Sequence, residues 1–86
     1  MHTVELLECA LEYAESLGYR VRQEWLGGTG GGACEFRGQK WIFLDVSLNV
    51  TEQLALVVET LRADPEVVYE TAPRWLQRYL AARRVA

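Results

Sequence analysis

The chain has 86 residues, half of them apolar and 24% charged, and its formal net charge is −3. This length supports one hydrophobic core, so we expect a single domain over residues 1–86. The composition is typical of a globular protein and excludes a disordered chain. The acidic balance argues against a nucleic-acid partner, because phosphate binding needs a concentrated basic surface.

The longest apolar runs, Trp41–Leu44 and Leu54–Val58, fall far short of the roughly 20 residues that cross a bilayer. The N-terminal residues 1–5 lack the basic region and apolar stretch of a signal peptide. Cys9 and Cys34 show no spacing typical of a disulfide or a metal site. We therefore expect a cytoplasmic protein with reduced thiols, no membrane contact, no cofactor and no metal.

The first third of the chain predicts a helix, a strand and a glycine loop. Residues 4–17 carry apolar side chains at helical spacing, with Thr3 as the cap and Gly18 as the left-handed residue that ends the helix. Residues 19–26 alternate as a strand does. The next segment, Gly27–Gly32, has five glycines in six positions, which predicts a mobile loop. The residues of this candidate flexible binding loop are Gly28, Thr29, Gly30 and Gly31.

A β-hairpin follows the glycines. Residues 33–37 and 40–46 are strand-like, and Gly38-Gln39 between them suits a type II′ turn. That turn places Phe36 opposite Trp41 and Cys34 opposite Phe43. The second strand is apolar on both sides, which predicts cover on both faces. The strand at 19–26 can pair with either strand of the hairpin, and the sequence leaves the strand order open.

Asn49 and Glu52 have the spacing of a capping box, which predicts a helix over residues 50–63. Leu56 lies outside the apolar stripe of this helix. A short helical turn over 65–69 follows, and then a last helix that Thr71 caps and that ends near Arg83. The order predicts an α+β fold, with a small, mostly antiparallel three-stranded sheet packed against helices.

Two further features of the sequence are candidates for a site. Residues 28–33 match G-x-G-x-x-A, the dinucleotide-binding fingerprint, but a strand follows where that motif needs a helix. This context favours a simple connection between strands. Asp45 lies on the same alternation as Phe43, and we interpret it as a strand-end carboxylate that meets water, with a capping contact or a pair to Arg20 or Arg22 as the alternatives.

The surplus of apolar side chains favours a non-enzymatic protein that acts through protein contacts, with self-association as a homodimer as the favoured form. The candidate interaction surface consists of Trp75, Tyr79, Arg78 and Leu56. One alternative is a small-molecule or thiol-dependent enzyme with a pocket under Gly27–Gly32, whose polar groups would be Cys34, Asp45 and Glu35. Another alternative is nucleic-acid binding by the C-terminal aromatics and arginines, namely Trp75, Tyr79, Arg74, Arg78, Arg83 and Arg84.

Residues 42–45 and 49–62 resemble the strand-then-helix part of small HExxH metallopeptidases of the ImmA/IrrE type. In that family the helix carries the zinc-binding histidines. The corresponding positions here hold Val58 and Arg62, and only Glu59 matches. The resemblance therefore implies a similar layout of strand and helix without the zinc. The order of glycine segment, hairpin and helix is also similar to that of other short bacterial proteins.

Overall fold

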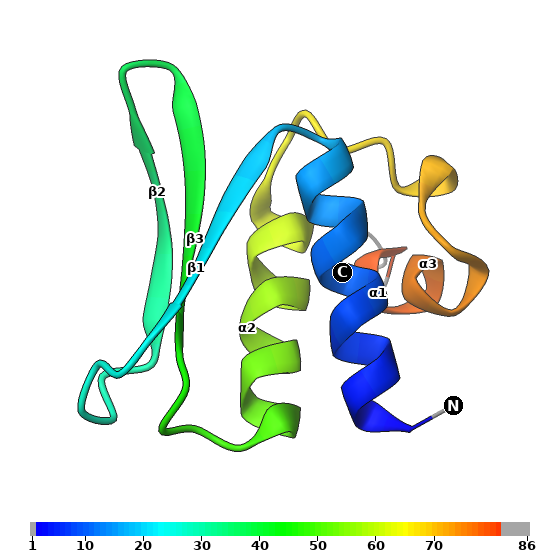
Figure 1. The fold of residues 1–86 in the computed structure, drawn as a ribbon. Coiled ribbons are helices and arrows are strands. Elements are labelled where there is room, and N and C mark those ends of the chain that lie inside the picture. Colours follow the sequence, from blue (N-terminus) through cyan, green and yellow to red (C-terminus); the bar gives the residue numbers. More distant parts are fainter. Residues whose placement is uncertain (1, 82–86) are drawn as a thin grey trace.

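The computed structural model describes residues 2–81 and has its helices on one side of a three-stranded sheet (Figure 1). The elements are α1 (Thr3–Ser16), β1 (Tyr19–Glu24), β2 (Gly31–Phe36), β3 (Gln39–Asp45), α2 (Val50–Ala63), the 3-10 turn η1 (Tyr69–Thr71) and α3 (Arg74–Ala81). The predicted α+β order is confirmed. None of the described helices is both long enough and apolar enough to span a bilayer.

The strand order is β1-β3-β2, so β3 is the central strand. β1 runs parallel to β3, with Val21 opposite Ile42, and β2 runs antiparallel to β3, with Ala33 opposite Ile42. The sheet is therefore mixed. This arrangement answers the question that the sequence left open, and it makes β2 an edge strand.

The turn of the hairpin lies one residue earlier than predicted. Phe36 pairs with Gln39 and Cys34 with Trp41, so the two turn residues are Arg37 and Gly38. Both have positive φ, 51° and 79°, as a type I′ turn requires. The predicted type II′ turn and its register are thus wrong. The register differs by two residues, and because side chains alternate with period two, the predicted division of side chains between the faces still holds.

The two faces of β3 have different surroundings. Ile42 and Leu44 face the helices and are fully buried. Trp41 and Phe43 face away from the helices and are half-buried, so the predicted cover on both faces is wrong for this side. Their rings stack at 5.8 Å between centroids, and the Arg20 guanidinium lies 5.7 Å from the Trp41 ring centroid. We call the side of the sheet that carries Trp41 and Phe43 the open face.

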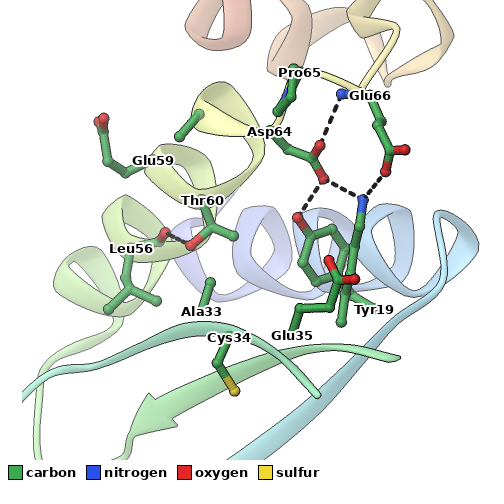
Figure 2. A pocket seen from close by; sticks show the side chains of 12 residues that line it. Tyr19, Ala33, Cys34, Glu35, Leu56, Glu59, Thr60, Asp64, Pro65 and Glu66 are labelled. Atoms are coloured by element: carbon green, nitrogen blue, oxygen red, sulfur yellow. Dashed lines mark hydrogen bonds and ion pairs between the residues drawn. The ribbon is translucent and has the colours of Figure 1, made fainter. Parts of the chain in front are cut away.

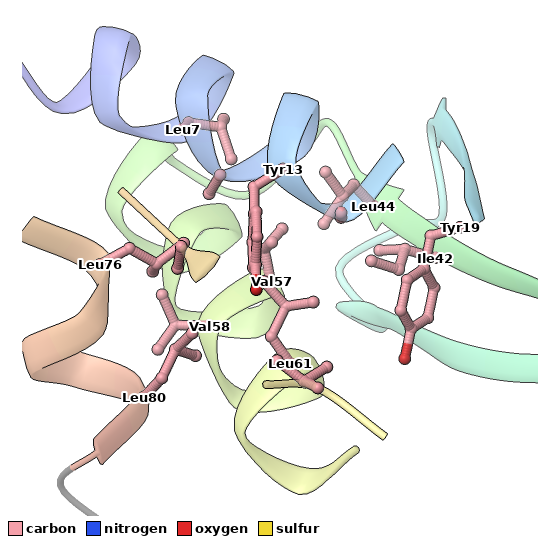
Figure 3. Packing of buried hydrophobic residues seen from close by; sticks show 14 residues of the cluster. Leu7, Tyr13, Tyr19, Ile42, Leu44, Val57, Val58, Leu61, Leu76 and Leu80 are labelled. Atoms are coloured by element: carbon pink, nitrogen blue, oxygen red, sulfur yellow. The ribbon is translucent and has the colours of Figure 1, made fainter. Parts of the chain in front are cut away.

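The core lies between α2, α1, α3 and the inner face of the sheet (Figure 3). Its largest members with almost no exposed surface are Ile42, Leu44, Val57, Leu61 and Leu76. They come from β3, α2 and α3, so α2 is the central helix of this layer.

The boundaries of the N-terminal elements differ slightly from the prediction. Thr3 lies inside α1 instead of capping it, and the helix begins after His2, whose N–H donates to the Glu5 carboxylate at 3.2 Å. Gly18 ends the helix with φ 99°, as predicted. β1 stops at Glu24, two residues earlier than expected.

The capping box and the bounds of α2 are confirmed. Glu52 N–H donates to the Asn49 side chain at 2.8 Å, and Asn49 N–H donates to the Glu52 carboxylate at 3.1 Å. The following turn lies at 69–71 instead of 65–69. Thr71 does not cap α3, because the helix begins only at Arg74, after Pro73. The Thr71 hydroxyl is instead bonded to the Tyr13 hydroxyl at 2.9 Å. The predicted end near Arg83 lies outside the described residues.

Candidate functional site

Asp45, the last residue of β3, holds the glycine segment in place. One carboxylate oxygen accepts hydrogen bonds from Leu26 N–H at 3.1 Å and from the N–H and hydroxyl of Ser47 at 2.9 and 2.6 Å. The other accepts from the N–H groups of Gly28 at 2.7 Å and Gly30 at 3.2 Å. The residue has no exposed surface. The interpretation of Asp45 as a carboxylate that meets water is therefore wrong.

The ionised state of this buried carboxylate is strongly favoured. Burial alone would raise the pKa of Asp45, but the hydrogen bonds from Ser47, Leu26 and Gly30 outweigh it and hold the pKa well below its usual range. The predicted binding loop thus directs the N–H groups of Gly28 and Gly30 inward, to a group of the same chain. The glycine segment is a turn that is anchored to Asp45 and leads directly into β2.

β2 is exposed on both faces. On its helix side Ala33 and Glu35 are exposed, and on the open face Cys34 and Phe36 are exposed, with Phe36 at 62%. Its outer edge pairs with no strand in the described part of the chain. The other edge strand, β1, is better protected, because α1 packs against it and it carries Arg20 and Arg22.

The hairpin geometry tells which backbone groups of β2 point outward. A two-residue turn closes on a hydrogen-bonded pair, here Phe36 with Gln39, and hydrogen-bonded pairs alternate along an antiparallel ladder. Cys34 and Phe36 therefore bond to β3. The N–H and C=O groups of Ala33 and Glu35 point away from the sheet, toward any strand that pairs with the edge.

A groove of about 690 Å³ runs between β2 and α2 on the helix side of the sheet (Figure 2). Its apolar wall is formed by Ala33, Leu56 and Ala63. The groove exists because the helix layer packs on β1 and β3 and leaves the inner side of β2 uncovered. Leu56, which is out of phase with the core stripe of α2, lines this groove instead of the core.

One end of the groove is closed by a polar network. The Tyr19 hydroxyl donates to the Asp64 carboxylate at 2.6 Å, and the Lys40 ammonium donates to Asp64 at 2.9 Å and to Glu66 at 2.5 Å. Burial alone would raise the pKa of Asp64, but the bonds from Tyr19 and Lys40 hold it below its usual range. Burial together with the bond to Asp64 raises the pKa of Tyr19 to about 12. Hydrogen bonds to Glu66 and Asp64 raise the pKa of Lys40.

The groove is acidic. Four carboxylates line it, from Glu35, Glu59, Asp64 and Glu66, against the single ammonium of Lys40. Glu59 pairs with Arg62 at 3.0 Å. Glu35 alone among the four has no hydrogen bond or ion pair within the described residues. Lys40 lies opposite Glu35 in the ladder, but its ammonium bonds to Asp64 and Glu66, so the Glu35 carboxylate has no ion pair of its own.

The structure does not bring the predicted interaction residues into one patch. Leu56 lines the groove beside β2, whereas Trp75 and Tyr79 line a second hollow of about 340 Å³ between α2 and α3. Their rings meet edge to face at 6.1 Å, and Tyr79 is 49% exposed. Arg78 is exposed on α3. Sequence reasoning missed Ala33, and it named Glu35 only as a polar group of a pocket under the glycine loop, because only the strand order shows that β2 is an edge.

The residues of the enzyme hypothesis are separated. Asp45 is buried under the glycine loop, Glu35 faces the groove, and the Cys34 sulfur points to the open face (Figure 2). The glycine loop does not line the groove that contains Cys34 and Glu35. Within residues 2–81, no group of His, Cys, Asp and Glu side chains is arranged to hold a metal ion.

Of the positions that correspond to the histidines of the metallopeptidase motif, Val58 is buried in the core. Arg62 donates to the carbonyl of Tyr79 at 2.9 Å. The chain matches no protein-family model, and the comparisons found no match among curated proteins or solved structures.

Proposed function

We propose that this protein is a non-enzymatic binding module that acts through protein contacts, and that its binding site is the outer edge of β2. The observation that carries the proposal is the exposure of β2 on both faces and along one edge. Proteins protect such edges with prolines, lysines, bulges or a covering element, because unpaired N–H and C=O groups accept a further strand. β2 has neither a proline nor a lysine, and only one charged residue, Glu35.

Strand addition uses features that β2 already presents. The backbone groups of Ala33 and Glu35 supply about four hydrogen bonds to a partner strand. Both ends of β2 are held in place: the hydrogen bonds to Asp45 fix the segment before it, and the type I′ turn fixes the segment after it. A strand that is already held in the bound conformation loses little entropy on binding, which favours affinity even for a short edge.

Self-association through the same edge is the second candidate. Antiparallel pairing of two copies with Cys34 opposite its counterpart would place Phe36 over the bare backbone of Gly32. The same pairing would bring a second Glu35 into an acidic groove, which disfavours it. A charged side chain on the inner face of an edge strand is one of the ways in which proteins prevent self-pairing.

Substitution of Ala33 with proline will weaken the binding of strand-forming peptides at least about fivefold, because it removes an outward N–H and adds a ring at the edge. The inward ladder to β3 is left intact, so the melting temperature should change little. The matched control, Ala33→Ser, keeps the N–H and should bind as the wild type does. Fluorescence anisotropy with labelled peptides of alternating valine and lysine, or valine and glutamate, measures the effect.

Two results would count against this proposal. If neither peptide binds, the edge is not a strand-binding site. If Ala33→Pro and Ala33→Ser bind equally well, the contact lies elsewhere. Sedimentation of the same samples distinguishes self-association from binding of another partner. A wild-type dimer that dissociates in the Ala33→Pro variant would identify a second copy as the occupant of the edge.

A further inference from the structure

The chemistry of the groove points to the kind of partner. We infer that the occupant of the β2 edge is an extended segment with lysine or arginine on one face and apolar residues on the other. The inference rests on the proposed function and specifies its partner. It follows from where the side chains of an added strand would lie, because these alternate between the helix side and the open face of the sheet.

Side chains on the helix side of an added strand enter the groove between β2 and α2. There they meet the Glu35 carboxylate and an apolar wall that includes Leu56, whereas the Glu59 carboxylate is already paired with Arg62. A lysine or arginine side chain suits this environment, since its alkyl stem packs on apolar surface while its charged end reaches the carboxylates. Glu35 in particular gains the ion pair that the described chain does not give it.

The polar network around Lys40 limits where such a segment finds an available carboxylate. Lys40 shares its charge between Asp64 and Glu66 and is held there by contacts of 2.9 and 2.5 Å. A cationic side chain that approaches Asp64 is therefore repelled by the Lys40 ammonium, which already occupies that carboxylate. Glu35 lies opposite Lys40 in the ladder between β2 and β3, but the Lys40 ammonium bonds to Asp64 and Glu66 instead, so Glu35 is the carboxylate of the groove that remains available to a cation.

Side chains on the other face of the added strand meet different neighbours. Phe36 is 62% exposed on that side, next to the open face with its half-buried Trp41. The Arg37 guanidinium already lies 5.2 Å from the Phe36 ring centroid. Apolar residues cover this aromatic surface, whereas further cations would be repelled by the arginines. The helix side of β2 thus selects cationic side chains of the partner strand, and the open face selects its apolar side chains. Such side-chain selection is how strand addition gains specificity.

The inference is tested with two labelled, end-capped peptides of equal length, one alternating valine and lysine and the other alternating valine and glutamate. We expect the basic peptide to bind at least about tenfold more tightly at low salt, and the preference to shrink as the salt concentration rises. Glu35→Gln should weaken the basic peptide about threefold to fivefold and leave the acidic one unchanged or improved. The control Glu8→Gln removes the same charge from the exposed surface of α1 and should have no effect.

The outcomes separate the partner from the site. If both peptides bind equally and Ala33→Pro weakens both, the edge is a strand-binding site but the basic partner is wrong. If Glu8→Gln weakens binding as much as Glu35→Gln does, the attraction is only that of the acidic protein as a whole. Spermine that displaces the peptide at equal concentration would show that the groove takes free polycations and not an extended segment.

Discussion

Substitution of Asp45 with asparagine will lower the melting temperature by about 10–20 °C. The carboxylate accepts five hydrogen bonds from a site with no exposed surface. An asparagine amide keeps one acceptor oxygen and turns a donor group toward backbone N–H groups that are themselves donors. Buried donors that lose their acceptor destabilise the folded state, so the loop from Leu26 to Gly30 should also become sensitive to proteolysis.

The pH dependence identifies the charge as the cause. Because the pKa of Asp45 is lower in the folded chain than in the unfolded chain, its stabilisation is complete above about pH 4 and is lost as the pH falls. The difference in melting temperature between wild type and Asp45→Asn should therefore be large at pH 7 and shrink below pH 4. Differential scanning fluorimetry from pH 7 to pH 2.5 measures it. A difference that stays constant over this range would contradict the role of the ionised carboxylate.

The control for this substitution is Glu24→Gln. Glu24 lies opposite Asp45 at the end of β1, but it forms an exposed pair with Arg22 at 2.6 Å. Exposed ion pairs contribute little to stability, so the melting temperature should change by no more than about 2–4 °C. If the two substitutions have similar effects, the anchor that we assign to Asp45 does not exist.

Substitution of Gly31 with alanine will destabilise the protein by about 3–5 kcal/mol. Gly31 has φ 87°, and a Cβ atom there would lie 1.9 Å from the carbonyl oxygen of Phe43 in the central strand. No side-chain rotation relieves this overlap, because the backbone fixes the position of a Cβ atom and the oxygen belongs to the backbone of β3. The start of β2 must move away from β3, and the site at the strand edge should be lost with it.

The neighbouring glycine provides a matched control. Gly32 does not have a positive φ, and a Cβ atom there meets nothing within 4 Å. Gly32→Ala should therefore change the free energy of unfolding by less than about 1 kcal/mol. Urea denaturation of the two variants compares them directly. Equal effects would mean that Gly31 is not the point where the backbone of β2 approaches β3.

Local signals predicted the helices well and the site poorly. The capping box of Asn49 and Glu52 defines the start of α2, and its bounds agree with the prediction. The turn was misplaced because Gly38 suits the first position of one turn type and the second position of another, and Arg37 with positive φ is uncommon for a non-glycine residue. Leu56 was the one local sign of the groove, since it does not fit the core stripe.

The remaining features depend on contacts between distant residues. Asp45 bonds to N–H groups 15 to 19 residues earlier, so its burial appears only when the chain returns to the glycine segment. The pairing of β3 with β1 as well as β2 leaves β2 as the edge, and the sequence permitted either arrangement. The acidic groove likewise joins β2 to the C-terminal half of α2. Spacing along the chain does not encode such contacts.

Amide hydrogen exchange of the wild-type protein tests most directly whether the β2 edge accepts a strand. The amides of Cys34 and Phe36 bond to β3 and should be protected with or without the valine–lysine peptide. The outward amides of Ala33 and Glu35 should exchange rapidly in the free protein and become protected when the peptide is bound. Peptide binding that leaves these two amides unprotected, or that protects only the region of Trp75 and Tyr79, would contradict the assignment of the site.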